Sequence, residues 1–426
     1  MEHDYVKRTQ WAIIIVFILS CVVFLIILAV SGAETEVMRD RFRNADDIFN
    51  GIMPELEYPP LVLVFILIPR IFASTPYWYA VGFAIEMLVF LIIGLLIVRK
   101  LAELLGKDQK KFMLAYTILM MLMFEFVVDR YDIIPAVLVL LAVYCYMTKR
   151  YAWAFILLSF GMMIKLYPAI LFPIFLIPFI MDRNWKEALK GTAAFVIASL
   201  AVVVPVMVFQ PDMLSYFIGY HADRPLQIES LLAPFIYLFA MFGFTDVAIE
   251  YGSGSDNLVG PWPDAAASLL TPLMILSIVL IYVLYAYKLK KMRDTEQDDE
   301  NSRLYLFASA ILLSVMMFIM VGKVFSSQYF IWMIPPLVFV FMTAPYTKEE
   351  RNIFILLAVT MAVTIGQFAY NVGYLGGAEF INDLGMMMIL ARNIMMIALL
   401  YLILKSIYRR IWINGSGSLE PQTTDS

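Results

Sequence analysis

Long apolar segments alternate with short polar connectors along most of the chain. Charged residues, proline or glycine bound each segment, as is typical of membrane-spanning helices. The pattern predicts twelve crossing helices, at residues 11–30, 79–98, 112–128, 133–147, 152–164, 169–181, 192–209, 269–287, 304–322, 329–343, 353–370 and 386–404. Several are shorter than the roughly 20 residues that a straight crossing needs, so we expect their ends to extend further.

One more apolar segment, Leu61–Phe72, is too short to cross. It follows Pro59 and Pro60 and contains Pro69 and Arg70, and a segment of about 12 residues is typically re-entrant or interfacial. We expect a short helix that dips in from the outer side. The whole pattern predicts an all-α polytopic membrane protein, a bundle of about 12 transmembrane helices plus this short re-entrant or interfacial helix.

Composition narrows the class of protein further. Hydrophobic residues make up 62% of the chain and charged residues 15%, against about 45–50% and about 25% in soluble domains. A soluble enzyme and a disordered chain are therefore excluded, and a net charge of −4 offers no basic surface for nucleic acid. Two cysteines within apolar segments and only two histidines argue against a disulfide framework, a cysteine zinc site or a histidine-rich metal centre. We expect no metal and no cofactor.

The basic residues indicate the orientation of the helices. If the N-terminus is cytosolic, 22 of the 31 Lys and Arg residues lie in cytosolic segments, 8 lie outside, and Arg392 lies within a span. This asymmetry follows the positive-inside rule. We expect a multi-pass protein of the plasma (cytoplasmic) membrane with both termini cytosolic, a first span retained as a signal anchor, one transmembrane domain over residues 1–413, and a disordered tail at 414–426.

Two external segments, residues 31–78 and 210–268, are too long to be simple connectors. In the first, Glu36, Asp40, Arg43 and Asp47 recur at the spacing of one helix face. The pattern predicts an interfacial helix whose acidic face meets water or a cavity, where a carboxylate could act as a general base. The alternative is a solvated surface helix.

Further polar residues mark the ends of other apolar segments. Glu57 and Tyr58 precede two prolines, which form a rigid turn that could hold both side chains at the mouth of a cavity. Cations are scarce on the outer side, yet several lie at span boundaries: Arg130, Lys165, Arg224 and Lys323. Cations at headgroup depth suit a lipid phosphate, so we expect these four to converge on one outward-facing cavity. Internal salt bridges and snorkelling are the alternatives.

An ordered series of motifs resembles glycosyltransferase family 87. After the acidic first loop come EYPPL, DRYDIIPA, KLYPAILFP, DRPLQIES and FSSQYFIWMIPP. The family comprises GT-C-fold, polyprenol-phosphate-mannose-dependent α-mannosyltransferases. The resemblance implies an inverting transfer of mannose from a polyprenyl-phosphate carrier to a glycan or glycolipid acceptor at the outer membrane face, with an acid of the first external loop as the base.

The candidate residues follow from these patterns together with the resemblance. The Asp-x-x-x-Tyr pattern typical of the family is missing from the first loop, and Glu36 or Asp40 lies nearest to its position. The candidate catalytic acids are Glu36, Asp40, Asp47 and Glu57. The candidate substrate-binding residues are Tyr58, Asp129, Arg130, Asp132, Lys165, Tyr167, Arg224, Gln227, Glu229, Lys323 and Gln328.

Two other functions fit the same composition. A transporter or flippase of lipid-linked saccharide also has many spans, although transporters concentrate ionisable residues near the bilayer midplane and contain repeated halves. A non-catalytic membrane partner in an assembly is the other alternative, and the altered first loop gives it some support. An enzyme requires an acid and the cations at one place, whereas a transporter requires a pathway open to either face.

Overall fold

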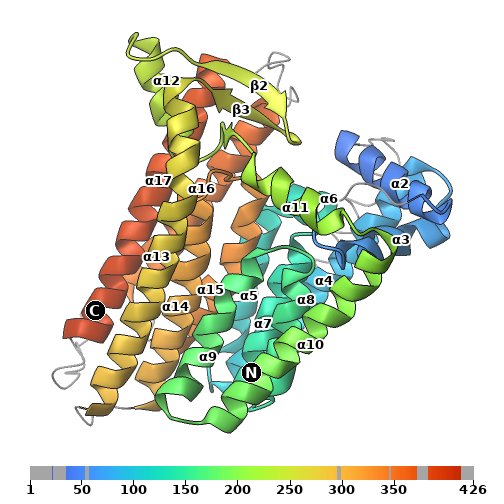
Figure 1. Ribbon diagram of the computed structural model, residues 1–426. Coiled ribbons are helices and arrows are strands. Elements are labelled where there is room, and N and C mark those ends of the chain that lie inside the picture. Colours follow the sequence, from blue (N-terminus) through green and yellow to red (C-terminus); the bar gives the residue numbers. More distant parts are fainter. Residues whose placement is uncertain are drawn as a thin grey trace, which may run out of the picture. The chain divides into compact units, whose positions relative to one another are not determined.

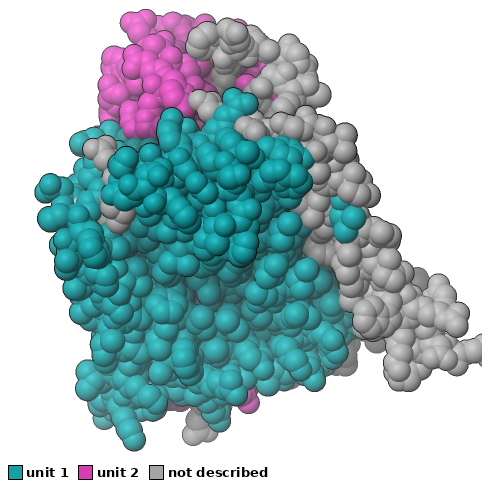
Figure 2. All heavy atoms as spheres, turned by 90° about the vertical axis from the view of Figure 1, so that its right-hand side faces the viewer, with its two compact units in different colours: residues 1–224, 326–338 teal, residues 225–325, 339–426 magenta. Residues whose placement is uncertain are grey.

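The computed structural model describes residues 22, 35–52, 57–294, 299–344, 347–371 and 382–413. They form two compact units, coloured separately in Figure 2: Met1–Arg224 with Ser326–Val338, and Pro225–Phe325 with Phe339–Ser426. We refer to these as unit 1 and unit 2. Apart from residue 22, the predicted span 11–30 lies outside the described residues, as does the predicted tail.

The described helices confirm an all-α polytopic membrane protein. Among the described residues, six helices are long and apolar enough to cross a membrane. They are α4 (Pro76–Leu104), α10 (Trp185–Phe209), α13 (Pro261–Asp294), α14 (Glu300–Val321), α16 (Lys348–Asn371) and α17 (Asp383–Tyr408). Shorter apolar helices account for further predicted spans, including α7 (Ile133–Met147), α8 (Tyr151–Met162), α9 (Phe172–Met181) and α15 (Phe330–Thr343).

Unit 1 places its connecting segments at two opposite ends. The remaining elements of this unit are α2 (Glu36–Phe49), α3 (Val62–Phe72), α5 (Gln109–Leu122), α6 (Phe124–Asp129), η1 (Tyr167–Leu171), α11 (Met213–Ala222) and η2 (Ser327–Tyr329). Figure 1 shows α2, α3, α6 and α11 gathered at one end of the long helices. Because successive helices reverse direction, the junctions at residues 129–132 and 163–168 lie at that same end.

The predicted short helix and the predicted acidic helix pack on one another. At 1.5 Å per residue, the 11 residues of α3 span about 16 Å, too little for a hydrocarbon core of about 30 Å. Arg70 near the end of α3 donates from Nε and Nη2 to Asp46 Oδ1 of α2, at 3.0 and 2.6 Å. Helices α2 and α3 therefore form a folded pair.

Local sequence explains where the long helices of unit 1 begin and how closely they approach. Thr75 caps α4 by accepting a hydrogen bond from the Trp78 N–H, with Pro76 at the first helical position. Between α8 and α10, a side chain at Gly191 would overlap the ring of Phe155. The hydroxyls of Ser159 and Ser199 lie 2.9 Å apart on the same two helices. Small residues thus permit the close helix packing that is common in membranes.

Unit 2 contains a small antiparallel sheet that the apolar pattern did not predict. Its strands are β1 (Leu226–Gln227), β2 (Ala248–Gly252) and β3 (Ser255–Val259), in the order β1-β3-β2. Strands β2 and β3 join through Ser253 and Gly254, whose φ angles are 51° and 68°. Positive φ at both central residues is the requirement of a type I′ hairpin turn. The sheet lies beside α12 (Ala233–Met241).

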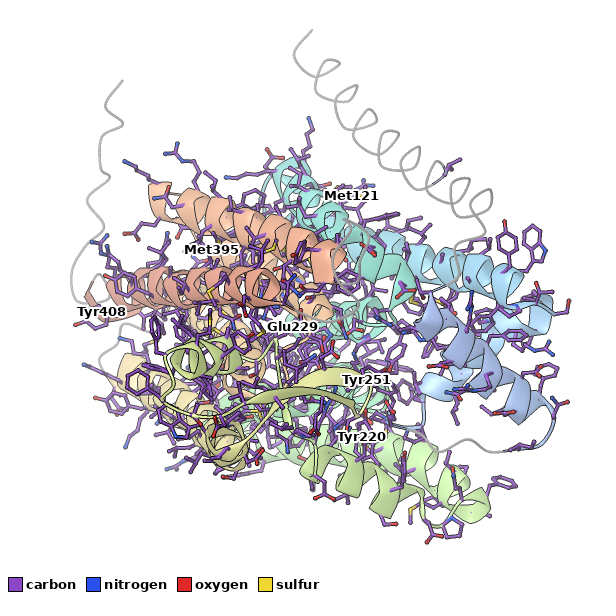
Figure 3. The ribbon with its side chains drawn as sticks, turned by 90° about the horizontal axis from the view of Figure 1, so that it is seen from above. Met121, Tyr220, Glu229, Tyr251, Met395 and Tyr408 are labelled. Atoms are coloured by element: carbon purple, nitrogen blue, oxygen red, sulfur yellow. The ribbon has the colours of Figure 1, made fainter. Side chains whose placement is uncertain are left out.

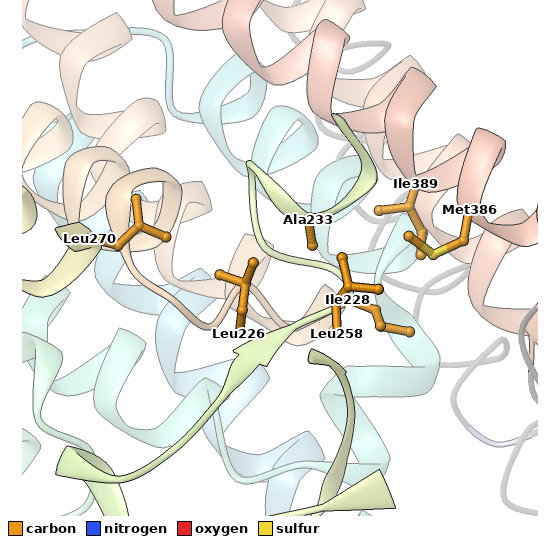
Figure 4. Close-up of a cluster of buried hydrophobic side chains, with 7 residues drawn as sticks. All are labelled: Leu226, Ile228, Ala233, Leu258, Leu270, Met386 and Ile389. Carbon is orange, nitrogen blue, oxygen red and sulfur yellow. The ribbon is translucent and has the colours of Figure 1, made fainter. Parts of the chain in front are cut away.

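An apolar cluster and a set of polar contacts connect the sheet region to the helices of unit 2. A buried apolar cluster, drawn in Figure 4, comprises Leu226, Ile228, Ala233, Leu258, Leu270, Met386 and Ile389. One turn further along α17, the fully buried Arg392 contacts Glu229 through a 3.4 Å ion pair, and its guanidinium lies 4.3 Å from the Phe325 ring centroid. Asn393 Nδ2 donates to the Ser230 carbonyl at 2.9 Å. A cation within a predicted span is thereby neutralised inside the protein.

Candidate active site

A buried ion pair lies at the junction end of unit 1. Lys165 follows α8, and its Nζ lies 2.6 Å from Oδ1 of Asp132, which immediately precedes α7. The Trp332 indole Nε1 donates to the same oxygen at 2.8 Å. The Asp132 side chain is only 1% exposed. With little water to screen the charges, their attraction is stronger than at a surface, and both donors hold the carboxylate in place.

Aromatic rings enclose the lysine of this pair. The ring centroids of Tyr58, Tyr131, Tyr329 and Trp332 all lie 5.2–5.7 Å from Lys165 Nζ. Trp332 is also stacked between two tyrosines, with centroid distances of 4.4 Å to Tyr167 and 3.9 Å to Tyr329. Ring faces attract a cation, so they stabilise the buried ammonium. We call Lys165, Asp132 and these five aromatic residues the Lys165 centre.

The Tyr167 hydroxyl is an unused polar group in this centre. Its oxygen is buried and has no hydrogen-bond partner in the described part of the chain. A buried hydroxyl without a partner costs free energy, and such groups commonly occur where a ligand or water binds. Tyr167 can therefore donate a hydrogen bond to a bound molecule.

A second cation, Arg41, reaches the centre from α2. Its guanidinium lies 5.2 Å from the Tyr131 ring centroid and 4.9 Å from that of Phe83, and it donates to the Asp129 carbonyl. Arg41 is buried. The Tyr131 ring thus contacts cations from two elements. Burial raises the pKa of Tyr131 well above its ordinary value, so its hydroxyl stays protonated at neutral pH.

The adjacent pair Asp129 and Arg130 lies at the start of α2. Asp129 Oδ1 accepts a 2.8 Å hydrogen bond from Thr35, the residue that caps α2, and its Oδ2 lies 3.4 Å from Arg130 Nη1. The Nε of Arg130 is buried without a hydrogen-bond partner among the described residues. This junction therefore adds a second incompletely bonded donor beside the Lys165 centre.

Glu57 and Arg224 both interact with Tyr220 on α11, at the same end of unit 1. Tyr220 is labelled in Figure 3. Burial raises the pKa of Tyr220 far above its ordinary value; the Arg224 charge opposes the shift and the Glu57 carboxylate adds to it. The Arg224 guanidinium lies 5.8 Å from the Tyr220 ring centroid and interacts electrostatically with Tyr329 of the centre. Glu57 is half-buried and adjoins Tyr58, which also belongs to the centre.

Comparison with known proteins identifies the family. The model of glycosyltransferase family 87 matches residues 56–321, more than half of the chain. The chain belongs to glycosyltransferase family 87. No curated protein matches it in sequence. Together with its apolar helices, family membership makes it a multi-pass membrane glycosyltransferase.

The candidate catalytic acids of this glycosyltransferase differ in whether they lie within the residues that the family model matches. Glu57 lies within the matched residues, whereas Glu36, Asp40 and Asp47 precede them. Asp40 is 54% exposed and pairs with Arg43 one turn along α2 at 2.8 Å. Asp47 is half-buried near the end of the same helix, and Glu36 begins it.

Unit 1 brings several predicted substrate-binding residues together. Tyr58, Asp132, Lys165 and Tyr167 belong to the Lys165 centre, with Asp129, Arg130 and Arg224 next to it. Gln328 lies beside Tyr329 in η2.

Three predicted substrate-binding residues belong to unit 2. The Gln227 side chain accepts a 2.9 Å hydrogen bond from the Phe325 N–H, and its own N–H donates to the Lys323 carbonyl at 3.0 Å. Glu229, labelled in Figure 3, pairs with Arg392. These contacts stabilise unit 2. That Lys323 joins the cations of unit 1 stays a prediction.

Four residues at the site are not among the sequence candidates: Arg41, Tyr131, Tyr329 and Trp332. Aromatic residues are common near the ends of membrane spans, so Trp332 does not stand out in the sequence, and Arg41 lies within a highly charged helix. A signal for Arg41 does exist in the sequence. It lies three residues after Met38 and four before Ala45, both buried, which places a cation on the apolar face of α2.

Proposed function

We propose that this glycosyltransferase moves a hexose, specifically mannose, from a polyprenyl-phosphate carrier to a lipid-linked or cell-surface acceptor at the outer face of the plasma membrane. The observation that carries the proposal is the Lys165 centre. A buried ammonium with an aromatic enclosure adjoins Arg41 and Arg130 at the end of unit 1 that also holds Glu57. Clustered cations suit a phosphate and a nearby carboxylate suits proton removal, so one place offers both requirements of sugar transfer.

The reaction breaks the bond between the anomeric carbon and the phosphate oxygen of the donor. A new bond forms between that carbon and an acceptor oxygen on the opposite face, as the family resemblance implies. The acceptor proton passes to a carboxylate, and the carrier leaves as polyprenyl phosphate with one more negative charge. Lys165, Arg130 and Arg224 are assigned to stabilise this charge, because preorganised cations act most strongly where charge develops.

We assign the general base to Glu57. Asp132 is unsuited to this role, because its Oδ1 already accepts hydrogen bonds from Lys165 and Trp332. Asp40 is exposed and paired with Arg43 on the outer surface of α2. Glu57 is half-buried and adjoins Tyr58 in the Lys165 centre. Glu36 and Asp47 remain the alternatives on α2.

Arg41 is expected to contribute to donor binding. Replacing it by methionine should raise the donor KM by about 10- to 100-fold, since a hydrogen bond to a charged group contributes roughly 1.5–3 kcal/mol. The acceptor KM should change little. Donor titrations at saturating acceptor measure the effect, with Arg43→Met as a matched control on the exposed face of α2. An unchanged donor KM in the Arg41 variant would remove Arg41 from the donor site.

The transfer reaction itself can be tested with purified protein in lipid vesicles. Polyprenyl-phosphate-mannose labelled in the sugar should pass its label to an acceptor glycolipid and release polyprenyl phosphate in equal amount. Polyprenyl-phosphate-glucose and a nucleotide-linked mannose serve as comparison donors and should be poor substrates. Movement of intact labelled donor between leaflets without bond cleavage would instead indicate a flippase.

A further inference from the structure

A twelve-residue segment of unit 2, residues 233–244, carries no charged side chain. Its sequence is APFIYLFAMFGF, and it forms α12 and the turn that follows. Only Ala233 and Pro234 at its start are buried. Large apolar side chains near its end are 48–72% exposed: Phe239, Met241, Phe242 and Phe244. An exposed apolar patch of this kind marks a surface that contacts something other than water.

This patch is continuous with an apolar stripe on α13. The Phe239 ring centroid lies 6.0 Å from that of Trp262 and 5.9 Å from that of Phe244. From Trp262 onward, exposed apolar residues recur every three to seven positions along one face of α13: Leu269, Leu273, Leu276, Leu280, Val283 and Tyr287. Only 11% of the most apolar stretch of this helix is buried inside the protein. A membrane-spanning helix with such a stripe faces lipid.

The length of the apolar stripe on α13 indicates how deep in the bilayer the α12 patch lies. Trp262 and Tyr287 are 25 positions apart, which corresponds to about 38 Å along a helix. This exceeds a hydrocarbon core of about 30 Å and is less than the 40–45 Å that includes both headgroup layers. Aromatic residues commonly occupy these two layers. Lys288, Lys290 and Lys291 follow Tyr287 directly and mark one layer, which places Trp262 in the other.

Contacts with α17 hold α12 in place. The Tyr237 hydroxyl donates to Asp383 Oδ1 at the start of α17, at 2.6 Å. Ala233 is buried in the cluster of Figure 4, next to Ile389 and Met386 of the same helix. With Ala233 and Tyr237 against α17, Phe239 lies on the opposite side of α12, and Phe242 and Phe244 follow in the turn beyond the helix.

We propose that residues 233–244 form a membrane-interfacial anchor, with Phe239, Met241, Phe242 and Phe244 embedded in the headgroup layer opposite the lysine-rich end of α13. The occupant is the lipid bilayer, because the Phe239 ring contacts Trp262, where the lipid-facing stripe of α13 begins. Its lack of charge agrees with burial beside acyl chains, and aromatic residues are the usual anchors of interfacial helices. This anchor is independent of the proposed sugar transfer.

The anchor can be tested with a fluorescent label at Phe242. In a C21S/C145S chain, F242C would carry an environment-sensitive nitrobenzoxadiazole group in phosphatidylcholine vesicles. The matched control is Y251C on β2, because Tyr251, labelled in Figure 3, is 75% exposed and Phe242 is 72% exposed. We expect blue-shifted emission at position 242 and stronger quenching by lipids spin-labelled at acyl carbon 5 than at carbon 12. Position 251 should be quenched by aqueous iodide instead.

Two outcomes would overturn the anchor. Equal iodide quenching at positions 242 and 251 would place the patch in water. Protection from both iodide and spin-labelled lipid would mean that a protein surface, such as a second copy of the chain, covers it. Met241→Cys provides a second labelling position should the F242C chain fail to elute as a single species. None of these readouts depends on transfer activity, so failure of the anchor is distinct from failure of the proposed function.

Discussion

Replacing Lys165 by methionine is expected to abolish sugar transfer and to destabilise unit 1. The substitution leaves the Asp132 carboxylate buried without its cation. Removing one partner of a buried ion pair typically costs about 3–5 kcal/mol, because the remaining charge is uncompensated. Thermal unfolding of the purified protein should shift to lower temperature, and transfer from the lipid-linked donor should fall below detection.

The double variant K165M/D132N separates stability from chemistry. Replacing both charged partners removes the uncompensated charge, and the asparagine Oδ1 can still accept the hydrogen bond from Trp332. Unfolding should therefore return toward that of the native protein while transfer stays lost. Asp132→Asn alone should be destabilised, because it leaves Lys165 buried without a counter-charge. A double variant that transfers sugar within tenfold of the native rate would mean that the ion pair serves stability alone.

Replacing Glu57 by glutamine is expected to lower the rate of transfer by about 10²–10⁴-fold, the usual contribution of one general base. The exchange removes the charge and keeps the size of the side chain. Donor affinity should stay near the native value, because the base acts on the acceptor. Single-turnover assays with preloaded donor measure this step directly.

The α2 acids supply the comparison for Glu57. Asp40→Asn changes an exposed carboxylate whose partner is Arg43, so it should keep most of the native rate. Glu36→Gln and Asp47→Asn complete the series of first-loop acids. A large loss in one of these variants, with Glu57→Gln near the native rate, would move the base to α2 and contradict our assignment.

The helices were largely predictable from the sequence, because an apolar span ends where charge begins. Helix α7 has the predicted limits, 133–147, with Asp132 before it and Lys149 shortly after it. The predicted span 112–128 is instead divided at Met123 into α5 and α6, at a position without the proline or glycine that usually signals a break. The β2–β3 hairpin has a signal in its Ser-Gly turn, which the search for long apolar segments passed over.

The site was predictable only in part, for a physical reason. Asp132 and Lys165 stood out because charges between apolar segments are costly unless they are paired. The hydrogen bond from Trp332 to Asp132 joins residues that are 200 positions apart. Local patterns of polarity carry no information about such a contact. Arg41 was obscured by the charged residues around it in α2, although its position on the apolar face distinguishes it from them.

The contribution of Trp332 also affects how the protein is made. Unit 1 is discontinuous in sequence, and residues 326–338 return to it only after residues 225–325 of unit 2 have been synthesised. A nascent chain that has reached residue 325 already contains Lys165 and Asp132 but lacks Tyr329 and Trp332, and with them two of the four rings around the ammonium. Completion of the centre is therefore a late step in biosynthesis. Polypeptides released prematurely from the ribosome would insert helices into the membrane without acquiring a finished site.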